Sequence, residues 1–400
     1  MSKNFIPTVH KGKAHEADIF NVQYSKFATI TTSGDGYLKV WKNYLNEGDL
    51  PEDNVQSKFL TKAGLHHTSF LEFKDLETKK SMLFIGTISF TGELFIEKYD
   101  VEKNEFENDL DLKKILNFDT MMESQEDQSK SYHNIIEKNT FYLIKFLPMN
   151  LNNKIPMDKL LLTTVDSKVI VLDLMYQSET STFDVTKVET LQITEKSLGF
   201  KTLQQSETPF ITCMDASNKL SNVLTLGFNT SHAPDSESVH TDPAVQYISD
   251  FKAPMTLAST AVSLCMTSKR ATSLATTRTT HTQPKDTNTF THTASCLAID
   301  FNETDEFIAT AGLDSVVNVW ETITRERVGR IKVACSDIEN NQDIMDKDPV
   351  TLETLTYPGI MDVKYIHKNS RGGLGGAKNE GLVVAALDRG IRWFREAGGI

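Results

Sequence analysis

The stretch SGDGYLKVW, from Ser33 to Trp41, decides the fold. Its Gly-Asp-Gly segment favours a tight turn, because glycine and aspartate accept the backbone angles that turns require. After the turn, the side chains of Leu38 and Val40 point to one face of a strand, and Trp41 points to the other. The preceding segment FATITTS is rich in β-branched residues, which favour strands. The sequence therefore predicts a strand, an aspartate turn and a second strand that ends in tryptophan.

Nearly the same phrase returns as AGLDSVVNVW, from Ala311 to Trp320. In both phrases an aspartate lies six residues before the tryptophan and four after a threonine, and a histidine precedes the unit. The four positions are His15, Thr31, Asp35 and Trp41 in the first unit, and His292, Thr310, Asp314 and Trp320 in the second. Recurrence at fixed offsets indicates a repeated structural unit.

This arrangement resembles the WD40 repeat. In that family the histidine, the serine or threonine, the aspartate and the tryptophan form a buried, hydrogen-bonded tetrad that locks one four-stranded blade. The resemblance assigns the eight residues above to two such tetrads. The physics agrees, because a buried carboxylate is tolerated only where it is paired and hydrogen-bonded. The aspartate that ends the family's repeat is replaced by Lys42 in the first unit and by Glu321 in the second.

Weaker copies of the unit fill most of the remaining chain. They are GLHHTSFLEF with SMLFIGT and SFTGELFIEKY, FYLIKF with LLLTTVDSKVIVLDL, ITCMDAS with NVLTLGF, and GIMDVKYI with GLVVAALDRGIRWF. The sequence therefore predicts an all-β fold, a seven-bladed WD40 β-propeller over residues 1–400 as a single domain, with blade five uncertain. Seven units of about 57 residues exceed the usual repeat length of ~40–45. Two acidic insertions, 101–138 and 336–350, explain the excess, and the first favours a short helix around Leu110 to Leu116.

Residues 229–289 break the pattern. The segment is rich in serine and threonine, contains no glycine and shows no strand-turn-strand rhythm. Three interpretations stay open: a disordered insertion, degenerate strands with AVQYISDF as an outer strand, or a stretch of sequence that is locally out of frame. The blade pattern stops at Asn229 and resumes at Phe290.

Composition excludes several other classes. The net charge of −12 argues against a protein that grips a phosphate backbone, so no direct nucleic-acid binding is expected. No run of eighteen apolar residues exists, and the first twenty residues lack a secretory apolar segment, so neither a membrane span nor secretion is expected. The cysteines (Cys213, Cys265, Cys296 and Cys335) include no Cys-x-x-Cys pair, which indicates a reducing compartment and no cysteine zinc site.

The sequence also argues against catalysis. The glycine-rich stretch from Gly372 to Gly381 lacks a Ser or Thr after its lysine and favours a hairpin loop over a phosphate-binding loop. His66 and His67 have no further ligand at metal-binding spacing, so a structural role is favoured. The histidine–aspartate pairs recur once per unit, which a catalytic pair has no reason to do. We expect no enzyme, no metal and no cofactor.

Several phrases resemble a narrower family, the WD-repeat subunits of fungal Superkiller (Ski) complexes. They are KAHEADIF at 13–20, SGDGYLKVW, AGLHH at 63–67, SDIE at 336–339 and the ending DRGIRWFREAGG. The resemblance implies a non-catalytic scaffold that docks on a tetratricopeptide subunit in a complex with an RNA helicase. That complex supports 3′–5′ cytoplasmic mRNA decay by the exosome. The resemblance also implies a nuclear role with the topoisomerase-like protein that makes meiotic double-strand breaks, hence cytoplasmic and nuclear localisation.

In that family, partners present a Gln-Arg-x-x-apolar motif to the narrow top face of the propeller. Counting three residues from each histidine, or from its counterpart, predicts the contacts Asp18, Ser69, Tyr142, Ser295 and Ile360, with Phe141 and Leu313 as weaker candidates. Asp18 is suited to pair the arginine and Tyr142 to stack on it. Ordinary blade packing for Tyr142 and Phe141, and a solvated or capping carboxylate for Asp18, remain alternatives. A propeller that reads another peptide, such as a histone tail, or a propeller enzyme also stays open.

Overall fold

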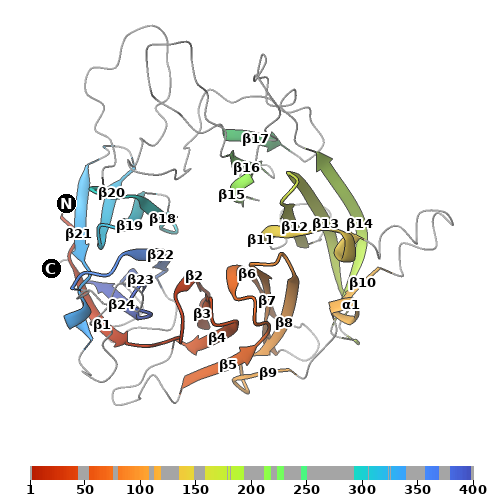
Figure 1. Cartoon of the computed structure of the whole chain (residues 1–400), viewed down its shortest axis with the longest axis horizontal. Coiled ribbons are helices and arrows are strands. Elements are labelled where there is room, and N and C mark those ends of the chain that lie inside the picture. The colour runs from red at the N-terminus through yellow and green to blue at the C-terminus, as the bar shows by residue number, and fades with distance from the viewer. Residues whose placement is uncertain are drawn as a thin grey trace, which may run out of the picture. The chain divides into compact units, whose positions relative to one another are not determined.

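The computed structural model describes residues 2–43, 54–74, 80–107, 112–118, 135–147, 158–177, 179–180, 182–192, 211–217, 223–228, 245–249, 292–304, 306–322, 324, 326–338, 356–368 and 379–397. They form six β-sheets, in which nearly all strand pairs are antiparallel (Figure 1). The chain divides into two compact units, one built from the residues up to His66 and from His292 onward, the other from His67. Helix is confined to single short turns in these residues.

The first unit holds three four-stranded sheets. One sheet contains β2 (Ile19–Tyr24), β3 (Ala28–Ser33), β4 (Tyr37–Lys42) and β5 (Val55–Phe59). The second contains β18 (Cys296–Phe301), β19 (Phe307–Gly312), β20 (Val316–Glu321) and β21 (Arg327–Lys332). The third contains β22 (Ile360–Ile366), β23 (Gly381–Ala386), β24 (Ile391–Glu396) and β1 (Phe5–Lys11). A short 3-10 turn, Cys335–Asp337, follows β21.

The β22–β24 sheet lies between the other two sheets of this unit, because β22 contacts both β18 and β2. Consecutive apolar residues in β23 point to opposite faces of this central sheet, so each of its two interfaces buries a cluster of side chains. Trp393 extends from β24 toward the β2–β5 sheet, where its indole nitrogen donates a hydrogen bond to Thr29 Oγ1 at 3.1 Å. Its ring also meets Trp41 edge to face.

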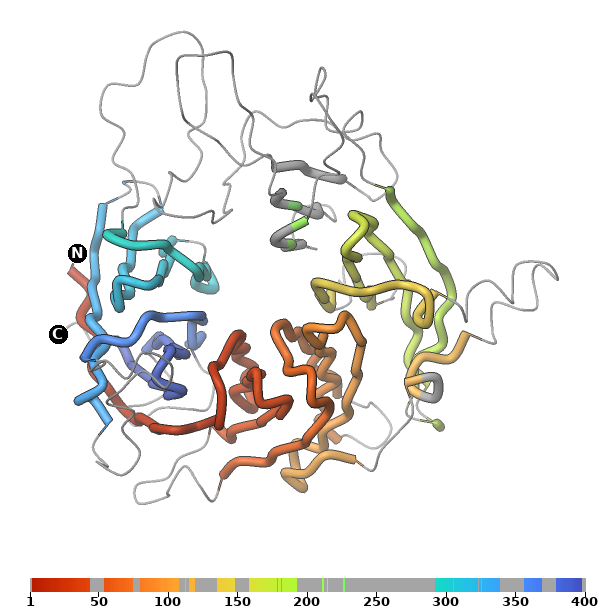
Figure 2. Tube along the Cα trace, viewed as in Figure 1, coloured from red at the N-terminus to blue at the C-terminus, as the bar shows by residue number. Residues whose placement is uncertain are grey.

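The two ends of the chain meet in one sheet. β1 pairs antiparallel with β24, and the chain ends marked N and C lie close together (Figures 1 and 2). A bulge between Pro7 and Val9 interrupts the register, and the Thr8 hydroxyl donates to the Trp393 carbonyl at 2.9 Å. Lys3 continues this contact, because its side chain pairs with Glu380 and Glu396. The last strand of the described chain is thus paired with the N-terminal segment.

The second unit holds three further sheets. They contain β6 (Leu65–Lys74), β7 (Ser81–Ser89), β8 (Leu94–Asp100) and β9 (Glu105–Phe106); β11 (Phe141–Leu147), β12 (Asp158–Thr164), β13 (Lys168–Gln177), β14 (Thr182–Gln192) and β10 (Leu116–Asn117); and β15 (Ile211–Ser217), β16 (Val223–Phe228) and β17 (Val245–Ser249). β17 is the outer strand that AVQYISDF suggested.

The insertion at 101–138 is anchored to the core rather than merely looped out. After α1 (Leu112–Ile115), β10 runs parallel to the start of β14 as a fifth strand of that sheet. Ile115, Leu116 and Phe118 are buried in the cluster between the β6–β9 and β11–β14 sheets. Residues 119–134 of the insertion, and 336–350 beyond Ile338, lie outside the described residues.

Repeated antiparallel four-stranded sheets packed face to face are the blades of a β-propeller, so the predicted fold class is confirmed. Apart from β17, the segment 229–289, and with it the uncertain fifth blade, lies outside the described residues. In the part of the chain that the structure describes, no helix has the length and apolar character needed to cross a membrane.

Candidate functional site

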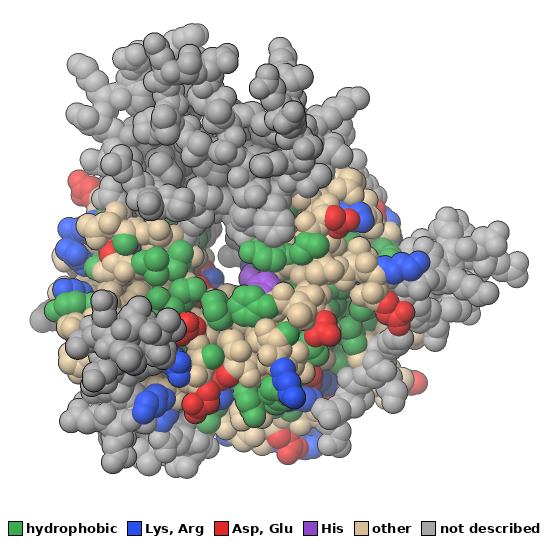
Figure 3. Space-filling view, in the orientation of Figure 1, with side chains coloured by type: hydrophobic (Ala, Val, Ile, Leu, Met, Phe, Trp, Pro, Cys, Tyr) green, Lys and Arg blue, Asp and Glu red, His purple; other side chains and the backbone are tan. Residues whose placement is uncertain are grey.

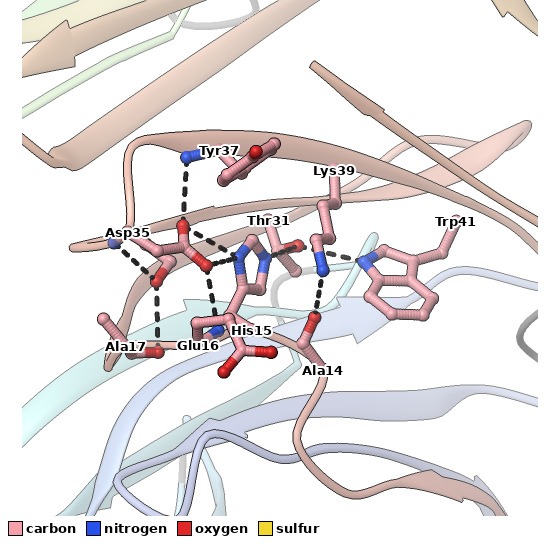
Figure 4. A network of polar contacts seen from close by, with 10 residues as sticks. Ala14, His15, Glu16, Ala17, Thr31, Asp35, Tyr37, Lys39 and Trp41 are labelled. Atoms are coloured by element: carbon pink, nitrogen blue, oxygen red, sulfur yellow. Dashed lines mark hydrogen bonds and ion pairs between the residues drawn. The ribbon is translucent and has the colours of Figure 1, made fainter. Parts of the chain in front are cut away.

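The structure brings His15, Thr31, Asp35 and Trp41 together beside the turn between β3 and β4 (Figure 4). The indole nitrogen of Trp41 donates to Thr31 Oγ1 at 2.9 Å, and Thr31 Oγ1 lies 2.9 Å from His15 Nε2. His15 Nδ1 lies 3.0 Å from a carboxylate oxygen of Asp35. The threonine hydroxyl accepts from the indole and is free to donate to Nε2, so a neutral His15 carries its proton on Nδ1 and donates to Asp35.

Electrostatics agree with this chain of donors. Burial lowers the pKa of His15, which favours the neutral ring. Burial by itself would raise the pKa of Asp35, but the contact with His15 and the amides of Tyr37 and Glu16 lower it to about 2. Asp35 is therefore a carboxylate held in place by three donors, the His15 ring and the amides of Glu16 and Tyr37, and it fixes the turn.

The same network recurs in the β18–β21 sheet. His292 Nδ1 lies 2.9 Å from Asp314, His292 Nε2 lies 2.8 Å from Thr310 Oγ1, and Trp320 donates to that hydroxyl at 2.9 Å. Both networks join the third strand of a sheet to the segment that enters its first strand. They are scaffold contacts with no substrate-sized opening between their members, and they position the turns that follow.

The turns between the second and third strands share one backbone conformation. The residue after the aspartate position has a positive φ in five sheets: Gly36, Gly92, Ser167, Ser315 and Arg389. The residue before the aspartate position is apolar in four of these turns, namely Phe90, Val165, Leu313 and Leu387. Phe90, Val165 and Leu313 are 53%, 48% and 43% exposed. Three of these turns therefore expose an apolar side chain to solvent.

A backbone hydrogen bond ties each tip to the residue that leads into the first strand of the same sheet. Gly34 N donates to the Asp18 carbonyl at 3.0 Å, and Leu313 N donates to the Ser295 carbonyl at 2.8 Å. The corresponding acceptors in two other sheets are Thr140, for Val165 N, and Gly359, for Leu387 N. Asp18 and Ser295 are thus equivalent positions, as the spacing predicted.

Comparison with known proteins identifies the family. Residues 284–321 match the family model "WD domain, G-beta repeat", a range that includes the second tetrad. The whole chain is similar to Antiviral protein SKI8 of Saccharomyces cerevisiae (strain ATCC 204508 / S288c), with 31% identity over 420 aligned residues and full coverage of both chains. This chain belongs to the SKI8 family of WD40-repeat proteins.

Three residues predicted to contact a partner are inside this SKI8-family fold. Ser69, Phe141 and Ile360 are 6%, 2% and 0% exposed. Ser69 lies within β6, where its hydroxyl accepts a hydrogen bond from Phe146 N at 2.9 Å. The prediction of these side chains as contacts requires correction, because a buried side chain has no surface to offer a docked peptide.

The remaining predicted contacts of the SKI8-family chain are accessible. Asp18 and Ser295 are half-buried and Leu313 is exposed, all in the first unit. Tyr142, in the second unit, is half-buried and packs against the apolar cluster around Leu143. Tyr142 lies two positions beyond Thr140, so counting from Asn139 missed the true counterpart of Asp18. The β11–β14 sheet has no histidine at the usual place, which removed the landmark for counting.

No group of three or more histidine, cysteine, aspartate or glutamate side chains in the described ranges is arranged to hold a metal ion. The side chains gathered at the turns of this SKI8-family member are instead apolar, with isolated charges beside them. That composition suits the docking of a peptide.

Proposed function

We propose that this chain is a non-catalytic scaffold subunit of a Ski complex that supports 3′–5′ cytoplasmic mRNA decay by the exosome. The observation that carries the proposal is the full-length similarity to Antiviral protein SKI8, which spans both chains end to end. The proposed partners are the tetratricopeptide subunit and, through it, the RNA helicase. A nuclear role with the topoisomerase-like meiotic protein, and residence in cytoplasm and nucleus, belong to the same proposal.

Asp18 is the proposed anchor for the arginine of a partner motif. Its backbone carbonyl is fixed by the Gly34 amide, so the side chain stands on a rigid turn. A carboxylate in a half-buried position binds a guanidinium more strongly than an exposed one does, since less water competes. Ser295 and Leu313 extend the proposed contact surface in the same unit, and Tyr142 is a separate proposed contact in the second unit.

Affinity purification tests this function. Tagged wild-type chain is compared with Asp18→Lys and with Glu303→Lys, an exposed residue at the opposite end of the β18–β19 hairpin from the Leu313 turn. We expect wild type and Glu303→Lys to recover a tetratricopeptide protein and an RNA helicase by mass spectrometry, and Asp18→Lys to lose both. Recovery with all three chains would move the site elsewhere while keeping the function. Recovery of histones, or of no stable partner by wild type, would reject the proposal in favour of another propeller class.

A further inference from the structure

A compact apolar patch lies between two sheets of the first unit; it shares Leu313 with the contact surface proposed above but does not include Asp18. We define the Leu313 patch as Leu313, Lys332, Tyr357 and Leu387. Leu313 is 43% exposed and Tyr357 is 49% exposed, while Leu387 is half-buried. On the face drawn in Figure 3, hydrophobic side chains gather over β18 to β20 and β22, the two sheets that supply these residues.

Gly359 allows the two leucine tips to meet. A Cβ atom at this position would lie 2.8 Å from Leu313 Cδ2 and 3.1 Å from Leu387 Cδ1, so any larger residue would push the tips apart. The Leu387 amide donates to the Gly359 carbonyl at 2.8 Å, which holds the second tip in place. The two side chains therefore form one surface across the boundary between the sheets.

Ser315 holds the polar side of the patch. Its hydroxyl donates to the Tyr357 carbonyl at 2.9 Å, and its own carbonyl accepts from the Val333 amide at 2.8 Å. The turn at Leu313, the end of β21 and the segment before β22 are thus tied together by one residue. The patch is consequently preorganised, which lowers the entropy that a ligand loses by ordering it.

Lys332 gives the patch its charge. Its ammonium group lies 3.5 Å from the centroid of the Tyr357 ring, in a cation–π contact, and the residue is exposed. In the described part of the chain no carboxylate lies within ion-pair distance of it. The chain carries 54 acidic against 42 basic residues. An exposed cation that no carboxylate of the described residues neutralises, placed beside an apolar surface, is complementary to an acidic and apolar ligand.

We propose that the Leu313 patch binds a short linear peptide that lays an apolar side chain on Leu313 and Leu387 and sets an Asp or Glu carboxylate on Lys332. The aromatic ring beneath the ammonium limits where the carboxylate approaches, so the two groups of the ligand are recognised in a fixed order. This specificity is opposite in charge to that of Asp18, and the inference does not rest on the proposed membership of a Ski complex.

Selection from a random dodecapeptide library displayed on phage, with the intact chain as bait, tests the proposal. We expect enriched peptides to carry Asp or Glu within three positions of a large apolar residue. The best peptide is then synthesised with a fluorescent label and titrated by anisotropy. Lys332→Glu and Leu313→Ser should each weaken binding by about tenfold or more. Lys332→Arg should keep it, because the charge and the contact with Tyr357 remain.

Two controls separate this site from the rest of the unit. Lys368→Glu makes the same charge change beyond the far end of β22, and Asp18→Lys removes the proposed arginine anchor; both should bind the labelled peptide as wild type does. Replacing the peptide carboxylate by lysine should abolish binding to wild type and restore it to Lys332→Glu. Enriched peptides without acidic residues, equal binding by Lys332→Glu, or loss of binding in Asp18→Lys alone would each overturn the proposal. Thermal melts of all variants verify that the fold is retained.

Discussion

The guanidinium of Arg392 binds both carboxylate oxygens of Asp388 in the turn where the other two sheets of its unit pair a histidine with the aspartate. Both side chains are fully buried. Arg392 also donates to the Ala334 carbonyl at 3.0 Å, and thereby ties the turn to the segment that follows β21. The position is occupied in the first sheet by Lys39, which donates to the Ala14 carbonyl at 2.6 Å. One charged side chain thus does in the last sheet what a histidine and a lysine share in the first.

Replacing Arg392 by methionine should lower the free energy of unfolding by about 3–5 kcal/mol, because Asp388 would stay buried without its cation. Lys39→Met is the matched control and should cost less, since His15 still holds Asp35. The double variant Asp388→Leu/Arg392→Met should lose less than the sum of the two single changes. Urea unfolding measures the free energy of unfolding of the four variants Arg392→Met, Lys39→Met, Asp388→Leu and Asp388→Leu/Arg392→Met. Additive losses would show that the pair is not coupled.

Trp41→Phe isolates the hydrogen bond at the end of the first tetrad. The ring stays but the donor to Thr31 is lost, so we expect a loss of about 1–2 kcal/mol in the free energy of unfolding. Trp41→Ala also removes the buried ring and should cost about 3–5 kcal/mol. Trp320→Phe should behave like Trp41→Phe, because its indole donates to Thr310 Oγ1 at 2.9 Å, as that of Trp41 does to Thr31 Oγ1. A Phe variant as stable as wild type would show that the hydrogen bond from the indole nitrogen does not contribute to the free energy of unfolding.

His10 should make the fold acid-sensitive in a defined window. Burial, followed by the positive charge of Arg392, lowers the pKa of His10 from 6.5 to about 4, although Asp337 and Asp388 oppose the shift. Between these two pH values His10 is protonated in the unfolded chain but neutral in the folded chain. The free energy of unfolding therefore falls as the pH drops from 6.5 toward 4. His10→Phe has no such group to protonate. In denaturant titrations its free energy of unfolding should therefore rise relative to that of wild type when the pH is lowered from 7.5 to 5. If the difference in free energy of unfolding between His10→Phe and wild type were the same at pH 7.5 and pH 5, the lowered pKa of His10 would be contradicted.

Deleting residues 391–400 should harm the fold more than its length suggests. β24 lies between β1 and β23, so its removal leaves two strand edges open. We expect oligomers by size-exclusion chromatography with light scattering. Thr8→Val, which loses only the hydroxyl contact with the Trp393 carbonyl, is the control and should stay monomeric. A monomeric, soluble deletion variant would show that β1 does not depend on β24.

The repeated units and their turns were predictable because their chemistry is local. An aspartate, a residue with positive φ and an alternating strand follow one another within ten residues, so Asp35 and Asp314 were visible without any structure. The threonine partner was found through its fixed offset from the aspartate, and the histidine through its place ahead of the unit.

Other features depend on contacts distant in sequence. Arg392 replaces the tetrad histidine, and the ion pair with Asp388 has no counterpart in the repeat pattern. The acidic insertion predicted a helix near Leu112, but not the burial of Leu116 and Phe118 between two sheets. The partner contact at Ser69 was misplaced because His66, from which it was counted, lies within β6. Ile360 was counted without a histidine and lies one residue beyond Gly359, and a shift of one residue moves a side chain from the surface to the interior.

Because the first strand pairs with the last, β1 cannot complete its sheet until the chain has been almost fully translated. Thr8 leaves the ribosome 385 residues before the Trp393 carbonyl that it binds. At synthesis rates of about 5–20 residues per second, β1 waits for tens of seconds without its neighbour. A strand that waits so long is a target for chaperones or for stray pairing with other chains. Pro7, which offers no amide hydrogen, and the bulge beside it make that strand a poor template in the meantime.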